Sequence, residues 1–195
     1  MKKYLFVLLL ACALIVLTGC DVTITSNGQN NNPQVGVTIP APSGSTVSGS
    51  GSSSLGKQTK TSGCVPHGGL PDSACTPGAI FPNATPDVIC QYGYTRTVRN
   101  VPFSEKEEVY TEYGISHHSP GEYEVDHLVP LELGGSNDIA NLWPEAAYPQ
   151  PGFHEKDQVE NYLHDQMCSG AISLQEAQKE IAANWLAVYN RMPKQ

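Results

Sequence analysis

The residues best suited to chemistry lie in the middle of the chain, where Asp126-His127 is followed by Gly134-Gly135 and then by Asn141. Side chains of these types suit hydrolysis, which requires an activated water and, where a carboxylate holds one, a cation that stabilises the developing negative charge. A histidine, whose pKa lies near ambient pH, is a suitable general base for activating the water. Neighbouring side chains on a strand point to opposite faces, so Asp126 and His127 can face one substrate only where the strand bends or bulges.

Four short motifs follow one another in this segment. They are Asp126-His127, Pro130-Leu131, Gly134-Gly135 and, fourteen residues after the histidine, Asn141-Leu142. In this order they resemble the first two-thirds of the motif of HNH endonucleases, also called ββα-metal or His-Me finger nucleases. The wider segment is similar to exported bacterial HNH endonuclease-like lipoproteins. The matching features are Cys75-Thr76-Pro77-Gly78, Cys90, Gly93-Tyr94, Arg99, Trp143-Pro144, Lys156-Asp157, Glu160-Asn161, His164, Cys168 and Ala177-Gln178.

The resemblance implies a role for each residue of the motif. His127 becomes the general base and Asp126 a ligand of a divalent metal ion, either Mg²⁺, Mn²⁺ or Zn²⁺. Asn141 ties the hairpin loop together by hydrogen bonds and so orients the base. The ion stabilises charge on the phosphate oxygens and on the leaving oxygen.

The last position of the motif leaves alternatives open. The resembled family has His or Asn about nine residues after the structural asparagine, where this chain has Gln150 in a Pro-rich loop. We therefore expect the helix to start later and favour His154, at its start, as the remaining metal ligand. Asp157 and Asn161, one and two turns further on, are the alternatives.

Two basic residues could bind a phosphate, namely Arg99 and Lys156. Arg99 matches an arginine of the resembled lipoproteins. The alternative for both is a solvated charge or an ion pair, and this is the favoured interpretation of Arg96. The expected partner is a nucleic acid substrate, and no segment of the sequence indicates a protein partner.

The N-terminus predicts export and a lipid anchor. Lys2 and Lys3 precede an apolar run of about 14 residues, which is shorter than the ~20 that a membrane-spanning helix needs. The run ends in Leu17-Thr18-Gly19-Cys20, which resembles a bacterial lipobox and implies a lipid on Cys20. We therefore predict a signal peptide at residues 1–19 and a lipid-anchored protein of the cell envelope that faces the extracytoplasmic side.

Composition divides the remainder into a tether and one domain. Residues 20–62 are rich in Ser, Gly, Asn, Thr and Pro and predict a disordered tether. Residues 63–195 are of ordinary size for one domain. Two of the 11 Lys and Arg residues lie in the signal peptide. The rest of the chain therefore has 9 Lys and Arg against 19 Asp and Glu, a net charge of −10. Nucleic-acid binding must then rely on a local basic patch, a metal ion or a short substrate.

Four cysteines lie in the predicted domain, namely Cys64, Cys75, Cys90 and Cys168. An even number in an exported domain predicts two disulfides with three possible pairings. A four-cysteine zinc site is disfavoured, because the spacings of 11, 15 and 78 contain no closely spaced pair.

The residue pattern predicts an α+β domain with a ββα-metal core, flanking helices and stabilising disulfides. We expect strands at residues 89–98, 123–133 and 139–143, and helices at residues 104–113, 154–167 and 174–192. The predicted function is a metal-dependent HNH endonuclease that hydrolyses DNA or RNA outside the cytoplasm. The alternative is a catalytically degenerate HNH fold that serves as a binding or scaffold lipoprotein of the envelope.

Overall fold

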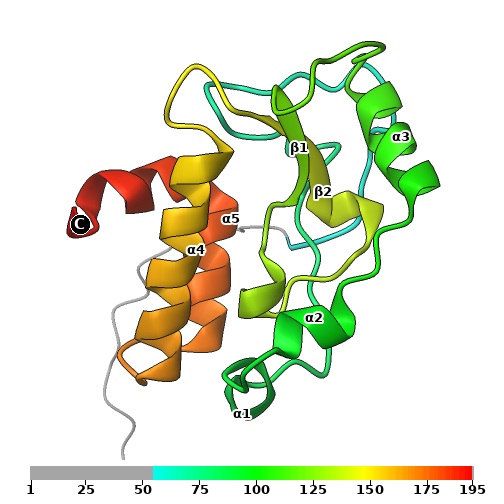
Figure 1. Ribbon diagram of the computed structural model, residues 1–195. Helices are drawn as coiled ribbons and strands as arrows, with labels where there is room; N and C mark the ends of the chain where they lie inside the picture. The colour runs from blue at the N-terminus through cyan, green and yellow to red at the C-terminus, as the bar shows by residue number, and fades with distance from the viewer. Residues whose placement is uncertain (1–54, 195) are drawn as a thin grey trace, which may run out of the picture. The chain divides into compact units, whose positions relative to one another are not determined.

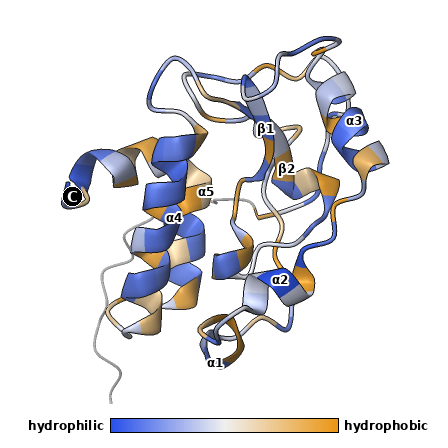
Figure 2. Ribbon diagram, viewed as in Figure 1, coloured by the Kyte–Doolittle hydropathy of each residue, from blue (hydrophilic) through white to orange (hydrophobic). Residues whose placement is uncertain are grey.

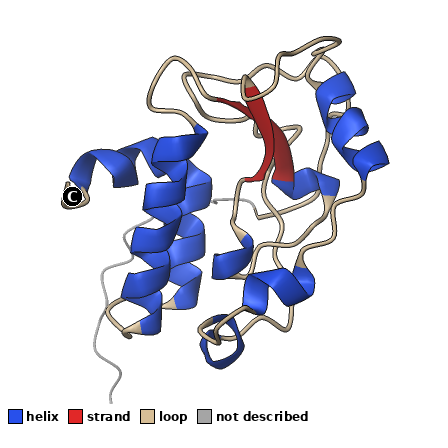
Figure 3. Ribbon diagram, in the orientation of Figure 1, coloured by secondary structure: helices blue, strands red, loops and turns tan. Residues whose placement is uncertain are grey.

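The structure, a computed structural model, describes residues 55–194 of the chain. Its elements follow one another as drawn in Figure 1. They are α1 (Pro86–Ile89), α2 (Tyr94–Val98), α3 (Phe103–Glu112), β1 (Tyr123–His127), η1 (Leu131–Leu133), η2 (Ile139–Asn141), β2 (Leu142–Ala146), α4 (Phe153–Cys168) and α5 (Leu174–Arg191). Helices combined with one small sheet (Figure 3) confirm the predicted α+β class.

The strands β1 and β2 form a two-stranded antiparallel sheet, the only sheet among residues 55–194. Their register places Asp126 opposite Trp143 and His127 opposite Leu142. α4 comes next in the chain and contacts β1. Two strands and a helix thus follow one another around Asp126 and His127.

Both strands are shorter than predicted. β1 ends at His127 rather than at residue 133, and β2 begins at Leu142 rather than at residue 139. Pro130, three residues beyond the end of β1, is the N-cap residue of η1 and directs the chain into that turn. The apolar residues that suggested a longer strand belong to the turn η1, whose two leucines are buried.

The strand predicted at residues 89–98 is wrong, since this segment contains the end of α1 and the whole of α2. Pro86 occupies the first turn of α1, where its missing N–H costs nothing. Gly93 precedes α2 with φ of 83°, a left-handed conformation that favours glycine. Helices of one turn are too short to show a helical period in the sequence.

The helices α4 and α5 pack against each other and form the main core (Figure 2). Val159, Ile181 and Trp185 have no exposed surface. The predicted helices at residues 154–167 and 174–192 are confirmed to within one residue at each end. Their apolar stripes, spaced three or four residues apart, made them predictable.

The two predicted disulfides join Cys64 to Cys75 and Cys90 to Cys168. The first closes a loop before α1, and the second connects the end of α1 to the end of α4. Both cross-links lie within a unit that spans residues 48–195 and contains both hydrophobic clusters. That unit has what an independently folding domain requires.

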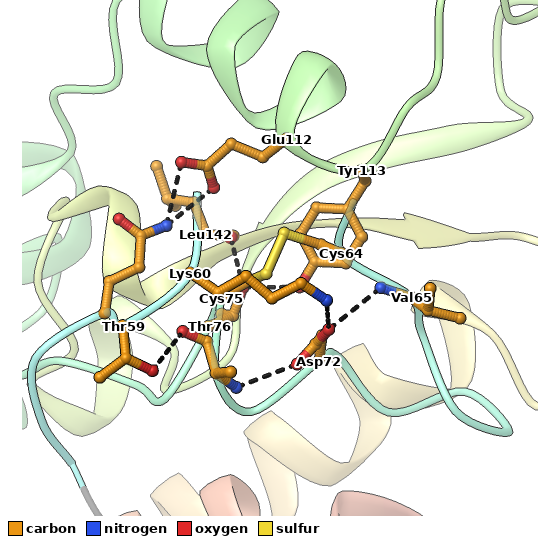
Figure 4. The surroundings of a disulfide bond; sticks show 12 residues. Thr59, Lys60, Cys64, Val65, Asp72, Cys75, Thr76, Glu112, Tyr113 and Leu142 are labelled. Carbon is orange, nitrogen blue, oxygen red and sulfur yellow. Dashed lines mark hydrogen bonds and ion pairs between the residues drawn. A yellow bond between two sulfur atoms is a disulfide. The ribbon is translucent and has the colours of Figure 1, made fainter. Parts of the chain in front are cut away.

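The domain begins earlier than its composition suggested. The backbone N–H of Gly56 donates to the carbonyl of Gly78 at 2.9 Å, and that of Thr59 donates to the carbonyl of Ala74 at 2.9 Å. The hydroxyl of Thr59 donates to the same carbonyl at 3.3 Å (Figure 4). Residues 56–60 therefore belong to the domain, because hydrogen bonds hold their polar backbone against it. The predicted signal peptide, the lipid site Cys20 and the tether before residue 55 lie outside the described residues. Between residues 55 and 194 no helix is long and apolar enough to cross a membrane.

Candidate active site

A small pocket of about 70 Å³ lies at the end of β1. Polar groups from three separate parts of the chain meet in it. Its lining consists of Thr95, Arg99, Asp126, His127, Pro130, Leu131, Glu132 and Glu160. The pocket thus brings together the predicted base, the predicted metal ligand and the exposed Arg99.

His127 ends β1 with only 2% of its surface exposed. Its ring Nε2 lies 3.2 Å from Oδ1 of Asn137. The amide nitrogen of Asn137 donates to the carbonyl of Val98 at 2.7 Å, which turns Oδ1 toward the ring. From this network we assign the hydrogen to Nε2, which leaves the lone pair on Nδ1.

Burial lowers the pKa of His127 to about 4, although the carboxylate of Asp126 opposes this effect. The positive charges of Arg99 and Lys156 lower it further. The imidazole is therefore neutral at pH 7, the state in which it can accept a proton.

Asn141 is fully buried and holds the loop between the strands. Its Oδ1 accepts hydrogen bonds from the backbone N–H of Val129 at 2.9 Å and of Ala79 at 3.3 Å. Its Nδ2 donates to the carbonyls of Val129 at 2.9 Å and of Ser136 at 2.8 Å. The amide uses its full hydrogen-bonding capacity in this way. This is the loop-tying geometry that the HNH resemblance implies for the residue.

The Gly-Gly motif is explained by the same loop. A Cβ on Gly135 would lie 1.7 Å from the carbonyl oxygen of Val129, a distance that no side chain tolerates. Gly134 has φ of 75°, and a Cβ there would lie 2.7 Å from the side chain of Ala84. Both positions therefore require glycine, because the loop backbone packs so closely on its neighbours there that a side chain would keep Asn141 from its hydrogen-bond partners.

Lys156 joins α4 to the hairpin through a fully buried side chain. Its Nζ donates to Oδ2 of Asp126 at 2.7 Å and to the carbonyl of His127 at 2.8 Å. It also donates to Glu160, one turn further along α4, and lies 3.9 Å from Oε2 of Glu145. These groups enclose the ammonium, so the predicted phosphate-binding role does not fit. Lys156 is instead placed to position the carboxylate of Asp126.

The carboxyl groups of Asp126, Glu145 and Glu160 surround this one ammonium. Glu145 is buried, whereas the side chains of Asp126 and Glu160 are 16% and 13% exposed. Burial raises the pKa of Glu145 well above its usual value and that of Glu160 to about 8, although Lys156 opposes both shifts. Burial also acts to raise the pKa of Asp126, but the charge and hydrogen bond of Lys156 outweigh it, and the net shift is downward. Lys156 and Asp126 therefore form the ion pair of the cluster, and the raised pKa values of Glu145 and Glu160 favour the protonated forms of these two groups.

The pocket contains oxygen ligands of the type that hard divalent cations prefer, but among the described residues no three of its ligand atoms lie within 4.8 Å of one another. Asp126 of β1 and Glu160 of α4 both contact Nζ of Lys156 and line the pocket, and Oε1 of Glu132 in the same pocket is buried without a hydrogen-bond partner. Mg²⁺ and Mn²⁺ prefer such carboxylate oxygens, and Zn²⁺ also accepts an imidazole. A bound divalent cation would displace the protons from those carboxyl groups that Lys156 does not neutralise.

The structure places the expected helix ligands elsewhere. His154, Asp157 and Asn161 are exposed, and none of them lines the pocket. The face of α4 that meets the pocket carries Lys156 and Glu160 instead. Sequence reasoning overlooked Glu160 as a ligand, although its i,i+4 spacing from Lys156 puts both on one helix face.

Arg99 follows directly after α2 and is exposed at the rim of the pocket. Among residues 55–194, no carboxylate lies within 4.0 Å of its guanidinium. Its charge is therefore available to an anion that enters the pocket, and the phosphate-binding role of Arg99 stays a prediction. A guanidinium can hold a phosphate through two parallel hydrogen bonds.

Comparison with family models, curated proteins and solved structures gave no match to the chain. The functional interpretation therefore depends on the motif and on the geometry of the pocket.

Proposed function

We propose that the domain is a metal-dependent HNH endonuclease that cleaves phosphodiester bonds in DNA or RNA. One observation carries the proposal: a neutral histidine, a set of carboxylates and an unpaired arginine line the same pocket. These are the base, the cation ligands and the phosphate-binding group that the hydrolysis requires. Asn141 supports the assignment because it fixes the loop beside the base.

The base in this proposal is Nδ1 of His127, which removes a proton from the attacking water. A pKa of about 4 makes the isolated imidazole a weak base. The negative charge of a phosphodiester beside Arg99 acts to raise that pKa, and the positive charge of the divalent ion acts to lower it. Asp126 next to the ring stabilises the imidazolium that results.

Asp126, Glu160 and Glu132 are the residues that would hold the divalent ion, and their carboxylates must come closer together to share it. When bound, the ion supplies positive charge to the phosphate and to the leaving oxygen. Arg99 orients the phosphate, and the closed loop at Asn141 keeps the base in line with the water. Lys156 holds Asp126 in place from the side of α4.

We place this activity in the cell envelope, with the chain anchored through Cys20. The two disulfides are compatible with an extracytoplasmic location, where such bonds persist.

A second candidate is a binding protein that keeps the fold without catalysis. It is favoured by the contacts of Lys156, whose ammonium bonds to carboxylates of both Asp126 and Glu160. A metal ion must compete with this ammonium for the same oxygens.

The test uses the unit from Ser48 to Gln195 with both disulfides formed. Plasmid DNA, single-stranded DNA and RNA are incubated with Mg²⁺, Mn²⁺, Zn²⁺ or EDTA. The variants are His127→Ala and the matched control His154→Ala, which changes an exposed histidine outside the pocket. We expect metal-dependent cleavage that His127→Ala abolishes and His154→Ala retains. Equal background cleavage by the wild type and His127→Ala with every metal would refute the endonuclease and favour the binding protein.

A further inference from the structure

A second group of potential metal ligands lies at the far end of α4. Sγ of Cys90, Sγ of Cys168 and a ring nitrogen of His164 all lie within 4.8 Å of one another. His164 and Cys168 are one turn apart on α4, and Cys90 caps the end of α1. Two sulfurs and one imidazole make up a ligand set that suits zinc.

The distances in this group are close to those of a zinc site. With Zn–S of about 2.3 Å and Zn–N of about 2.0 Å, a tetrahedral ion holds sulfur and nitrogen roughly 3.6 Å apart. Nε2 of His164 already lies 3.4 Å from Sγ of Cys168. The same geometry separates two sulfurs by roughly 3.8 Å, so the main change required is opening of the disulfide.

The other ring nitrogen of His164 also has a suitable neighbour. Nδ1 lies 3.8 Å from a carboxylate oxygen of Asp165. Histidine ligands of metals commonly turn their second nitrogen toward a carboxylate, which keeps the hydrogen there and leaves the lone pair on the coordinating nitrogen. At 3.8 Å the exposed Asp165 makes no hydrogen bond to the ring, and its contribution is a negative charge beside an imidazole that would bind a cation.

Exposure distinguishes this disulfide from the other one. Cys90 and Cys168 are both exposed, so a reductant and a metal ion can reach them. Cys64 and Cys75 are buried beside Asp72, Thr76 and Tyr113 (Figure 4), and within residues 55–194 no His, Asp or Glu completes a metal-ligand group with them. The chain therefore contains a built-in control, a disulfide without the third ligand.

We propose that Cys90, Cys168 and His164 form a redox-switched zinc site, which binds Zn²⁺ when the disulfide is reduced and releases it on oxidation. A dithiol breaks the Sγ–Sγ bond by exchange, leaves as its own disulfide and delivers two electrons to the cysteines. Zinc then binds two thiolates and Nε2, displacing two protons. A small-molecule disulfide reverses the reaction by removing the two electrons, which re-forms the bond. A water molecule completes the tetrahedral ion, as in open zinc sites.

Zinc binding to the unit from Ser48 to Gln195 tests the proposal. The protein is reduced with a water-soluble phosphine, which offers no thiolate, then exposed to Zn²⁺ and freed of excess metal. We expect one additional zinc per chain in the reduced protein relative to the oxidised protein. Reduced wild type and reduced His164→Ala are then compared by competition with a chelator, and the variant should bind at least about tenfold more weakly.

Two variants separate this site from non-specific binding by exposed thiols. The Cys64→Ser/Cys75→Ser protein should keep the extra zinc, and the Cys90→Ser/Cys168→Ser protein should lose it. Mass spectrometry after alkylation provides a readout that does not depend on stoichiometry, because zinc should protect Cys90 and Cys168 alone. Equal protection of all four cysteines, or equal zinc in oxidised and reduced protein, would overturn the proposal. Zinc held equally in both redox states would belong to a different site, such as the pocket at His127.

Discussion

Replacement of Lys156 by methionine is the most informative single change, because one buried ammonium satisfies several groups at once. The substitution preserves most of the side-chain volume and removes the charge. Asp126 and Glu160 lose a hydrogen bond each, and so does the carbonyl of His127. The variant then contains buried carboxyl groups with no cation among them.

The expected loss in the free energy of unfolding at pH 7 is about 3–5 kcal/mol, the usual cost of removing one partner from a buried ion pair. The loss arises because Asp126, whose pKa Lys156 holds below its usual value, must stay charged without a partner or take up a proton. In the wild type, the Asp126–Lys156 pair stabilises the fold fully at pH values above the unfolded pKa of the Asp126 carboxyl, near 3.8. This stabilisation is lost as the pH falls through the lower pKa that the carboxyl has in the folded state. The difference between variant and wild type should therefore shrink in acid.

Urea unfolding, followed by tryptophan fluorescence, measures this free energy for the wild type, Lys156→Met and the control Lys179→Met. Lys179 is exposed on α5, so its replacement should change stability by less than about 0.5 kcal/mol. The measurement is repeated with Mn²⁺, which should stabilise Lys156→Met more than the wild type because Asp126 and Glu160 are no longer occupied by the ammonium. A metal ion at 100 times its dissociation constant adds about 2.7 kcal/mol.

A loss as small as that of Lys179→Met would refute the reasoning, since it would mean that the carboxyl groups do not depend on Lys156. A large loss without any effect of Mn²⁺ would preserve the structural role of Lys156 and remove the argument that the same carboxylates suit a cation.

Two further substitutions test the groups around the base. Asn141→Ala should lower the free energy of unfolding by at least about 3 kcal/mol, because it leaves several buried backbone groups without a hydrogen-bond partner. In the same urea experiment, the control Asn161→Ala, which changes an exposed residue, should alter this free energy by less than about 0.5 kcal/mol. His127→Gln should change the pH dependence of stability. The folded pKa of His127 is lowered from 6.5 to about 4, so its neutral form stabilises the wild type fully above pH 6.5 and progressively less toward pH 4. Relative to the variant, the wild type should lose up to about 3 kcal/mol over this interval, and parallel profiles would contradict the shift.

The parts of the fold that the sequence predicted are those in which a repeating pattern spans several turns. α4 and α5 each bury a long apolar stripe, so their positions follow from spacing alone. α1 and α2 are too short for such a pattern, and their apolar and aromatic residues suggested a strand instead. The cysteines predicted two disulfides but not their pairing, because the pairing depends on which elements meet in space.

The candidate site also has a part that the sequence predicted and a part that it did not. The positions of Asp126, His127 and Asn141 are tied to one loop, and a local motif is sufficient to predict them. The burial of Lys156 is a tertiary property, since it arises only when α4 packs on β1 and three carboxyl groups gather around one amine. A lysine in a polar helix segment otherwise predicts a solvated charge. The same packing decides that Glu160, rather than His154, faces the pocket.

One row of α4 connects the two sites. Lys156, Glu160, His164 and Cys168 follow at intervals of four residues, which places them along a single ridge of the helix. Glu132 lies between the two ends. Burial raises its pKa, and the charges of His164 and Lys156 both act to lower it. Zinc at His164 and Cys168 would place further positive charge near that carboxylate, and a cation in the pocket would do so from the other side. The two proposed metals should therefore bind with mutual repulsion, so reduction of the Cys90–Cys168 disulfide in the presence of zinc should weaken Mn²⁺ binding at the pocket.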